Sequence, residues 1–381
     1  MITLFSKTLD IHSLALRLAI TNFLFSMAFE TSQILLPLYA SEKGASNLQV
    51  GVIVAVYGMS HFLSSFIFGR LSDIHGRVKF IRLGLGLSAV AYFTQIVAPD
   101  YTLLLVARGS VGISMGITSA AIMAFTFENK KDVGRFSSMG ALGVFVGAIV
   151  AAIAQNYHAL FLISTICSLL AFGFSLSFKE SANQTLNRLP APIIPLGLIK
   201  NNYKVYLSFF VRQFGGFAIW SIFPLYLASI GASKFWIAII DAINMFGQFI
   251  FMRLVGRYDP AKVYQLGFII TIGVFLIYSI ANNYLQLIPV QAVLSVAWSC
   301  MFVGALNYLL TTNKERGTAT GVLYSSSFFA NGLGPFMGGA ASQYWGFSAV
   351  MLIGAGLTTV GLFITRGLTT KTAIKVDHHK T

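Results

Sequence analysis

Long apolar stretches alternate with short polar segments along the whole chain. A helix that crosses a bilayer needs about 20 mostly apolar residues, and twelve stretches come close to this length. They lie at residues 14–39, 48–68, 80–98, 102–127, 137–155, 159–178, 204–229, 235–255, 264–282, 286–310, 318–341 and 346–366. The pattern therefore predicts an all-α integral membrane protein, whose twelve transmembrane helices we number as spans one to twelve.

The longest interval between two spans lies in the middle of the chain, at residues 179–203. It contains three prolines, and we interpret it as a cytoplasmic linker. On either side we expect a six-helix bundle, at residues 1–178 and at residues 204–381, the second with a short cytoplasmic tail. The other intervals are too short to hold a separate soluble domain.

The two halves share a sequence pattern at a constant offset. Residues 36–47 read LPLYASEKGASN and residues 223–234 read FPLYLASIGASK, an offset of 187. The same offset relates the Gly-Arg pair at residues 69–70 to another at residues 256–257. Span one thus corresponds to span seven. Because an even number of crossings separates them, both halves have the same membrane orientation, and such a parallel repeat suits alternating access.

Positive charge is distributed asymmetrically about the predicted membrane. The chain has 26 Lys and Arg residues against 12 Asp and Glu residues, a net charge of +14. With a cytoplasmic N-terminus, all basic residues except Lys43, Lys234, Arg108 and Arg212 fall on the cytoplasmic side, as the positive-inside rule predicts. We therefore expect a multi-pass plasma membrane protein with both termini in the cytoplasm. The charge reflects topology and does not indicate nucleic-acid binding.

Composition excludes most other classes of protein. Apolar residues make up 56% of the chain and charged residues 10%, whereas a soluble chain has about 25% charged residues. The two cysteines, Cys167 and Cys300, both fall in apolar spans, so neither a disulfide framework nor a metal site is indicated. The sequence also lacks the HExxH, GxSxG and nucleotide-binding P-loop motifs. We therefore expect neither an enzyme nor a bound cofactor.

The loop between spans two and three carries the sequence Gly69-Arg-Leu-Ser-Asp73-Ile-His-Gly76-Arg77. It resembles the signature loop of the major facilitator superfamily, G-x-L-x-D-x-x-G-R, at the place where that family has it. Asp73 and Arg77 are four residues apart and can pair. The resemblance implies a cytoplasmic latch, in which the Asp faces the start of span eleven and the Arg meets Glu128 at the end of span four. The alternative is that these charges only set the topology.

Further segments resemble motifs of the same superfamily. Span four carries Leu104-x3-Arg108-x3-Gly112, and in that family this Arg accompanies proton-coupled transport. Span eleven carries a Gly-Pro-x2-Gly motif, whereas span five lacks the proline of the antiporter form. The resemblance covers the whole chain and implies the superfamily's fold. The small residues that we expect at helix contacts or hinges are Gly112, Gly143, Gly147, Gly215, Gly216, Gly334, Pro335 and Gly338.

Four ionisable side chains fall within the spans, where such groups are costly and mark pathways. Glu30, Arg108 and Asp241 are candidates for proton coupling. Burial favours a neutral Glu30, whereas a nearby Arg108 favours a charged one, so coupling, a structural pair and direct substrate contact all remain open for Glu30. Asp241 is either a second protonation site or a hydrogen-bonding group at the seam between the halves. The fourth group, Arg212, either binds an anionic substrate or pairs with Asp241.

Polar and aromatic side chains on the spans are candidates for a substrate cavity. In the superfamily, spans one, four, seven and ten line the cavity, and spans two, five, eight and eleven form the seam. The aromatic residues of span seven either stack on a substrate or fill the bundle, and His61 of span two either titrates or packs. The cavity candidates are Asn22, Ser26, Gln33, Arg212, Phe217, Trp220, Gln291 and Trp298.

These observations indicate a secondary transporter that moves a small organic solute by alternating access. Our first hypothesis is proton-coupled efflux of a drug or metabolite. Proton symport or facilitated uptake of a sugar, organic acid or amino acid is the alternative, and a receptor that does not transport is a third. The expected partners are the substrate and the lipid bilayer, the driving force is an ion gradient, and the expected state is a monomer.

Overall fold

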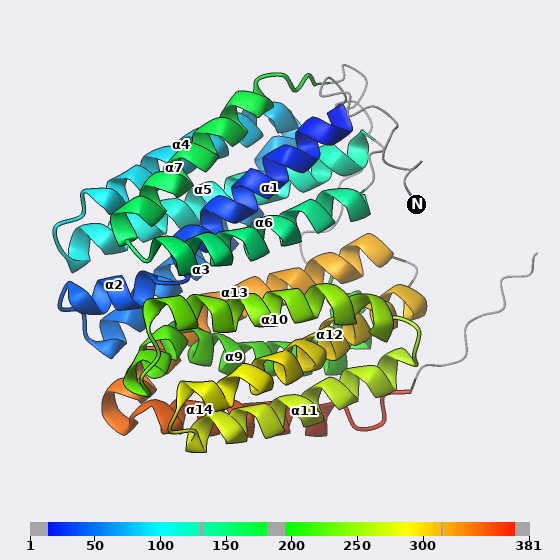
Figure 1. Ribbon diagram of the computed structural model, residues 1–381. Helices are drawn as coiled ribbons and strands as arrows, with labels where there is room; N and C mark the ends of the chain where they lie inside the picture. Colours follow the sequence, from blue (N-terminus) through cyan, green and yellow to red (C-terminus); the bar gives the residue numbers. More distant parts are fainter. Residues whose placement is uncertain (1–13, 130–132, 181–194, 314, 370–381) are drawn as a thin grey trace, which may run out of the picture.

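The computed structural model describes residues 14–129, 133–180, 195–313 and 315–369, and within them the chain is helical (Figure 1). The first half contains α1 (Leu14–Gln33), α2 (Leu36–Glu42), α3 (Asn47–His75), α4 (Arg77–Ile96), α5 (Tyr101–Glu128), α6 (Val133–Ala154) and α7 (Tyr157–Ser175). The second half contains α8 (Leu196–Asn201), α9 (Tyr203–Ser229), α10 (Lys234–Val255), α11 (Pro260–Ile280), α12 (Leu287–Thr312), α13 (Arg316–Trp345) and α14 (Phe347–Ile364). A short 3₁₀ turn, η2 (Tyr284–Gln286), precedes α12.

Each predicted span corresponds to a long helix, and two details differ from the prediction. The first span is divided, because α1 ends at Gln33 and α2 begins at Leu36 with Pro37 in its first turn, a position at which proline suits a new helix. The expected linker also contains a helix, α8. Residues 181–194 of that linker lie outside the described part of the chain.

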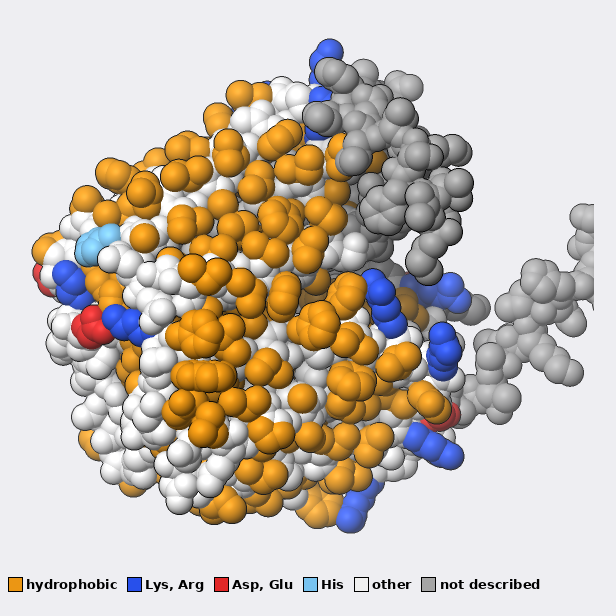
Figure 2. Space-filling model, in the orientation of Figure 1, with side chains coloured by type: hydrophobic (Ala, Val, Ile, Leu, Met, Phe, Trp, Pro, Cys, Tyr) orange, Lys and Arg blue, Asp and Glu red, His pale blue; other side chains and the backbone are white. Residues whose placement is uncertain are grey.

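Ten helical segments in the described residues are long and apolar enough to cross a membrane. The long helices α4 and α13 are not among them. α4 begins with Arg77, Lys79 and Arg82, and α13 is rich in Gly and Ser. Both nevertheless pack along neighbouring helices, α4 on α5 and α13 on α3. Figure 2 shows apolar side chains covering the flank of the molecule, with charged side chains gathered towards its two ends.

The long helices form two bundles of six with matching internal contacts, counting α1 and α2 as one span. In the first bundle α1 packs on α6 and α7, α3 on α5, and α4 on α5 and α7. In the second bundle α9 packs on α13 and α14, α10 on α12, and α11 on α12 and α14. Each contact has its counterpart at the corresponding place in the other bundle, as expected for a parallel repeat.

The repeat extends to the conformation of single residues. Gly44 has a φ of +85° and Gly231, 187 residues later, has a φ of +91°. This left-handed region favours glycine. Two residues after each glycine, Ser46 and Ser233 cap the next helix, each accepting a hydrogen bond from the backbone N–H three residues ahead. The turn between the first two spans of each half is therefore built in the same way.

Two helix pairs make most of the contact between the bundles, α3 with α13 and α6 with α10. These are spans two, eleven, five and eight, the seam that the family resemblance implied. At α3 the approach is close, because a β-carbon on Gly51 would lie only 2.8 Å from the Cα of Gly339 on α13. At the other pair, the rings of Phe145 and Phe246 lie 5.7 Å apart.

The small residues expected at helix contacts lie mostly against neighbouring backbones. Gly112 faces α3, Gly143 and Gly147 face α1, and Gly215 faces Gly354 of α14. On α13, Gly334 and Gly338 face α9, and the carbonyl of Pro335 faces α3. Side chains at these positions would separate the helices. Gly216 is different, because its neighbour is a charged side chain, as described below.

Candidate functional site

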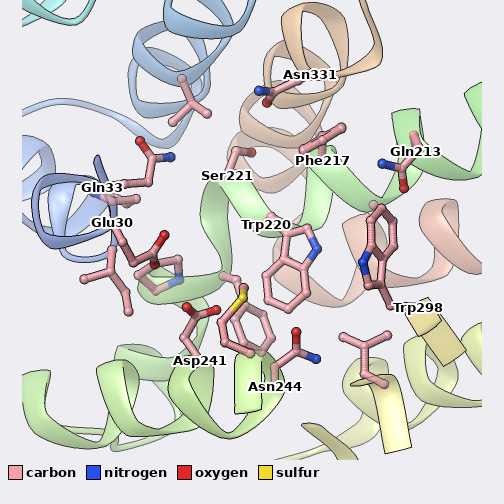
Figure 3. Close-up of a pocket in the computed structure, with 18 of the residues that line it drawn as sticks. Glu30, Gln33, Gln213, Phe217, Trp220, Ser221, Asp241, Asn244, Trp298 and Asn331 are labelled. Atoms are coloured by element: carbon pink, nitrogen blue, oxygen red, sulfur yellow. The ribbon is translucent and has the colours of Figure 1, made fainter. Parts of the chain in front are cut away.

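A cavity of about 350 Å³ lies between the two bundles. Residues of α1, α2 and α3 line it from the first half, and residues of α9, α10, α12 and α13 line it from the second (Figure 3). Its volume and its mixture of aromatic and polar groups are typical of a small-molecule site. In the described residues, no group of three or more His, Cys, Asp or Glu side chains is placed to hold a metal ion.

Two carboxyl groups from opposite halves meet in this cavity. Glu30 on α1 and Asp241 on α10 face one another in the cavity wall (Figure 3). Two carboxylates brought together in a buried site repel each other, which favours a proton on one of them. Glu30 is only 7% exposed. The arrangement is therefore suited to hold a proton between the two halves, away from bulk water.

Arg108 lies behind the wall of the cavity. It is fully buried, its Nη2 donates a hydrogen bond to Oε1 of Gln33, and its guanidinium lies 4.7 Å from the centre of the Tyr57 ring. Gln33 and Tyr57 line the cavity, whereas Arg108 does not. The pairing of Glu30 with Arg108 that the sequence left open is not formed, because the partner of Glu30 is Asp241.

Arg212 on α9 lines the cavity and is 2% exposed. Its Nη1 donates to Oε1 of Gln213 at 2.6 Å, and its guanidinium lies 5.2 Å from the ring of Trp298 and 5.7 Å from that of Phe275. Its Nε has no hydrogen-bond partner. The pairing of Arg212 with Asp241 is likewise not formed.

Aromatic side chains form much of the remaining wall. Phe217, Trp220 and Trp298 all line the cavity, as predicted, and Figure 3 shows the indole ring of Trp220 between the two acid groups and the indole ring of Trp298. The ring of Trp220 is held edge-on against Phe223, with 5.0 Å between the centroids. These flat apolar surfaces suit a planar organic molecule.

Several polar lining residues were missed by the sequence analysis. Gln213 donates from Nε2 to Oγ of Ser327 on α13 at 3.0 Å, and Ser221 and Asn331 also line the cavity. A signal was available on span seven, because Gln213 lies four residues before Phe217 and seven before Trp220, on one helical face. The residues of span eleven had no such neighbours to single them out.

Three predicted cavity residues do not line this cavity. Asn22 donates from Nδ2 to the carbonyl of Phe136 at 2.8 Å, and Ser26 lies beside Gly140, so α6 covers this part of α1. Gln291 is fully buried behind Asn244, which donates to its backbone carbonyl at 3.3 Å. Of the polar candidates on α1, only Glu30 and Gln33, in its last turns, line the cavity.

His61 has a hydrogen-bonding partner at each ring nitrogen. Nδ1 lies 3.3 Å from the hydroxyl of Tyr57, and Nε2 lies 3.2 Å from Oγ of Ser119. The ring also packs against Phe328 across the seam, 4.6 Å between centroids. This environment supports the packing interpretation of His61.

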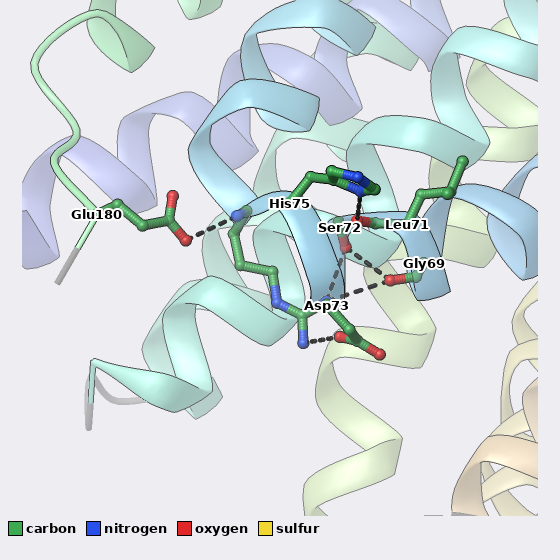
Figure 4. Close-up of polar contacts among 7 residues, drawn as sticks. Gly69, Leu71, Ser72, Asp73, His75 and Glu180 are labelled. Carbon is green, nitrogen blue, oxygen red and sulfur yellow. Dashed lines mark hydrogen bonds and ion pairs between the residues drawn. The ribbon is translucent and has the colours of Figure 1, made fainter. Parts of the chain in front are cut away.

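The signature loop is held by short polar contacts (Figure 4). Arg77 forms an ion pair with Asp73, and its Nη1 donates to Oγ of Ser72 at 2.7 Å and to the carbonyl of Gly69 at 3.4 Å. The pairing of residues four apart was predicted. The side chain of Glu128 lies outside the described part of the chain, so its expected contact with Arg77 stays a prediction.

Glu180, at the start of the linker, was not identified from the sequence. Its carboxylate accepts a hydrogen bond from the backbone N–H group of Arg77 at 2.7 Å (Figure 4) and another from that of Val78 at 2.9 Å. These are free amides at the N-terminus of α4, where negative charge is stabilising. Gly76, with a φ of +95°, lies directly beside the carboxylate. The linker is thereby tied to the signature loop.

Known proteins resemble this chain over most of its length. The sequence profile of the Major Facilitator Superfamily matches the chain twice, over residues 18–206 and 205–378. The chain is 23% identical to the quinolone resistance protein NorA of Staphylococcus aureus (strain COL), over 80% of this chain and 84% of that protein. It is 25% identical to the multidrug resistance protein MdtG of Salmonella arizonae, over 88% of this chain and 90% of that protein.

Solved structures have the same fold. The crystal structure of the nucleoside transporter NupG covers 93% of this chain and 98% of that chain, with a TM-score of 0.78 and 17% identity. That of the human organic anion transporter MFSD10 (TETRAN) covers 94% of this chain and all of that chain, with a TM-score of 0.69 and 16% identity. The repeated profile match, the two bundles and the cavity between them agree: the chain belongs to the Major Facilitator Superfamily, and it is a membrane transporter rather than an enzyme.

Proposed function

We propose that this transporter expels aromatic organic compounds from the cell in exchange for protons. The observation that carries the proposal is the Glu30–Asp241 pair, two carboxyl groups from opposite halves that face one another inside the cavity and can share a proton. The names of NorA and MdtG, which refer to drug resistance, support efflux. In this proposal the transporter lies in the plasma membrane with both termini in the cytoplasm, and the proton gradient is the driving force.

The pair can couple proton binding to movement of the halves. With one proton, the carboxyl groups attract each other and draw α1 and α10 together. Without it, two like charges at this distance repel, so the contact between the halves is lost. Arg108 lies behind Tyr57 and Gln33 and Arg212 is engaged by Gln213, so neither arginine neutralises the pair. The proton and a substrate that separates the two carboxyl groups therefore exclude one another.

Reconstituted vesicles with an imposed pH gradient test the coupling. We expect wild type to accumulate a fluorescent aromatic dye against its concentration gradient, and to release protons as dye binds. Glu30→Gln and Asp241→Asn should lower uphill transport about tenfold or more, equivalent to at least about 1.4 kcal/mol, while downhill exchange of dye continues.

Asp100→Asn, which removes an exposed carboxylate at the start of α5 but keeps a side chain that can cap the helix, serves as the control and should transport like wild type. Full uphill transport by both cavity variants would contradict proton coupling through the pair. Dye movement in the same direction as the protons would indicate symport and contradict efflux by exchange.

A further inference from the structure

A buried charge without a counter-charge is present in the cavity wall. Burying an unpaired charge is expensive, and arginine remains charged in proteins. The described contacts of Arg212 are the neutral amide of Gln213 and the faces of two aromatic rings. The Nε of Arg212 is buried and has no acceptor among the residues that the structure describes. The described residues therefore supply no acid for this guanidinium.

The position of Arg212 separates it from the two acid groups. Its contacts, Gln213 and Trp298, lie on the side of the cavity opposite Glu30 (Figure 3). A β-carbon on Gly216, one turn along the helix, would lie 3.1 Å from Nη1 of Arg212. The glycine thus leaves the space that the guanidinium occupies beside the cavity.

The surroundings also define what would fit next to the charge. The indole rings of Trp220 and Trp298 lie in the cavity wall (Figure 3). Planar carboxylates match the fork of a guanidinium, which can donate two parallel hydrogen bonds to them. Flat aromatic rings suit the faces of these two indoles.

We propose that Arg212 is an anion-binding subsite of the cavity, and that the transporter takes aromatic carboxylates, bound with the carboxylate on Arg212 and the ring against Trp220 and Trp298. The inference rests on the proposed function only in that the cavity is taken as the substrate site. Arg108 is a poorer candidate, because it does not line the cavity and already donates to Gln33.

Binding to the purified, full-length protein in detergent tests the subsite. The probes are 2-naphthoate and 2-naphthamide, which share the ring and nearly the same shape but differ in charge. Calorimetry at one fixed pH should give at least about tenfold tighter binding of the acid than of the amide, as expected for a hydrogen bond to a charged group. Equal binding of the two probes, or no binding of naphthoate, overturns the proposal.

Variants test which residue causes the preference for the acid over the amide. Arg212→Gln should bind both naphthyl probes equally, Arg212→Lys should keep part of the preference for the acid, and Gly216→Ala should weaken binding of the acid more than of the amide. Arg257→Gln, an exposed arginine outside the cavity, should behave as wild type. An unchanged preference for the acid in Arg212→Gln overturns the assignment. If that variant does not fold, the wild-type comparison and Gly216→Ala still decide.

The outcome is independent of proton coupling. The binding measurement uses no membrane and no gradient, so a preference for naphthoate can be found even where Glu30→Gln leaves uphill transport intact. Conversely, coupling through the pair can be found in a protein that does not distinguish naphthoate from naphthamide. The two proposals therefore fail in different experiments.

Discussion

Glu180 binds the N-terminus of α4 with both carboxylate oxygens, one to each of two backbone amides. Glu180→Gln keeps the shape but replaces one acceptor by a donor, which faces a backbone N–H. We expect a loss of about 0.5–2 kcal/mol, the usual range for a helix cap, seen as a lower midpoint of thermal unfolding in detergent. The neighbouring exposed Lys179→Gln should leave the midpoint unchanged. Equal midpoints for the two variants would show that the cap adds no stability.

His61 allows a second test at the same scale. Both of its ring nitrogens are engaged, by Tyr57 and Ser119, so a neutral amide can make the same contacts. We expect His61→Gln to transport with the pH profile of wild type, at a cost in stability of about 1 kcal/mol for the altered packing and hydrogen bonds. The measurement is dye transport in vesicles between pH 5.5 and 8.5, an interval of about one unit below to two above the ordinary histidine value. A displaced pH profile would assign His61 to the proton pathway.

At the residue scale, a contact or a shared face could be predicted when the residues lie on one helix or in one short segment of the chain. Helical spacing identified Phe217 and Trp220 as partners on one face of span seven, and a spacing of four predicted the pairing of Asp73 with Arg77. The contact of Glu30 with Asp241 is different, since it depends on how two helices from different halves meet. Spacing within a span carries no information on that distance, so the partner of Glu30 stayed open.

Among the helices, the pair of α3 and α13 tests how closely the halves must approach. Gly51→Ala places a methyl group 2.8 Å from the Cα of Gly339, against backbone that cannot rotate away. Overpacking of this kind costs about 1–3 kcal/mol, so the unfolding midpoint in detergent should fall and the seam should open.

The matched control is Gly173→Ala on α7, where the added methyl group meets nothing within 4 Å. Because alanine favours a helix by up to about 1 kcal/mol over glycine, this variant should be as stable as wild type or slightly more so. If Gly51→Ala is equally well tolerated, close contact between α3 and α13 is not required.

Helix positions were predictable because each crossing needs a minimum length of apolar chain. The break between α1 and α2 was not, although Pro37 was visible in the sequence. Proline permits a helix to begin as well as a helix to bend, and the apolar run continues through the break. α8 was missed for the related reason that so short a helix has no periodicity to detect.

In the whole molecule, the sequence repeat sets the helical scaffold, and the acidic groups of the cavity stand at positions where the two halves differ. Phe217 stands 187 residues after Glu30, and Val54 stands 187 residues before Asp241. All four line the cavity. Each carboxyl group therefore has an apolar counterpart in the other half. A single acid pair results, placed asymmetrically in a symmetric scaffold, and the sequence repeat alone could predict the scaffold but not this pairing.

The halves are also joined at the end of the molecule that we expect to be extracellular. Nζ of Lys234, at the start of α10, lies 3.1 Å from Oε1 of Glu42 at the end of α2, and 3.9 Å from the centre of the Tyr157 ring. The hydroxyl of Tyr157 donates to the same Glu42 oxygen at 2.5 Å. These three side chains hold the bundles together on this side. Opening the cavity towards it requires the contact with Lys234 to break.

Lys234→Met should therefore favour the conformation that is open at this end. Lys234 is 32% exposed and Glu42 56%, so solvent weakens the ion pair to about 0.2–1 kcal/mol, and the open population should rise by up to about fivefold. Spin labels at the exposed Ser41 and Ser229 report the distance between the halves, since the native cysteines are buried.

Lys43→Met is the matched control for Lys234→Met. Lys43 lies at the same end but donates to the carbonyl of Pro99 in its own half, at 3.4 Å, so its removal should leave the distances between Ser41 and Ser229 unchanged. A longer distance in the Lys234 variant alone would identify an ion pair that closes the cavity. The same distances in both variants would mean that closure rests on the packing of α3 against α13, and the Gly51 variant should then be the one that opens.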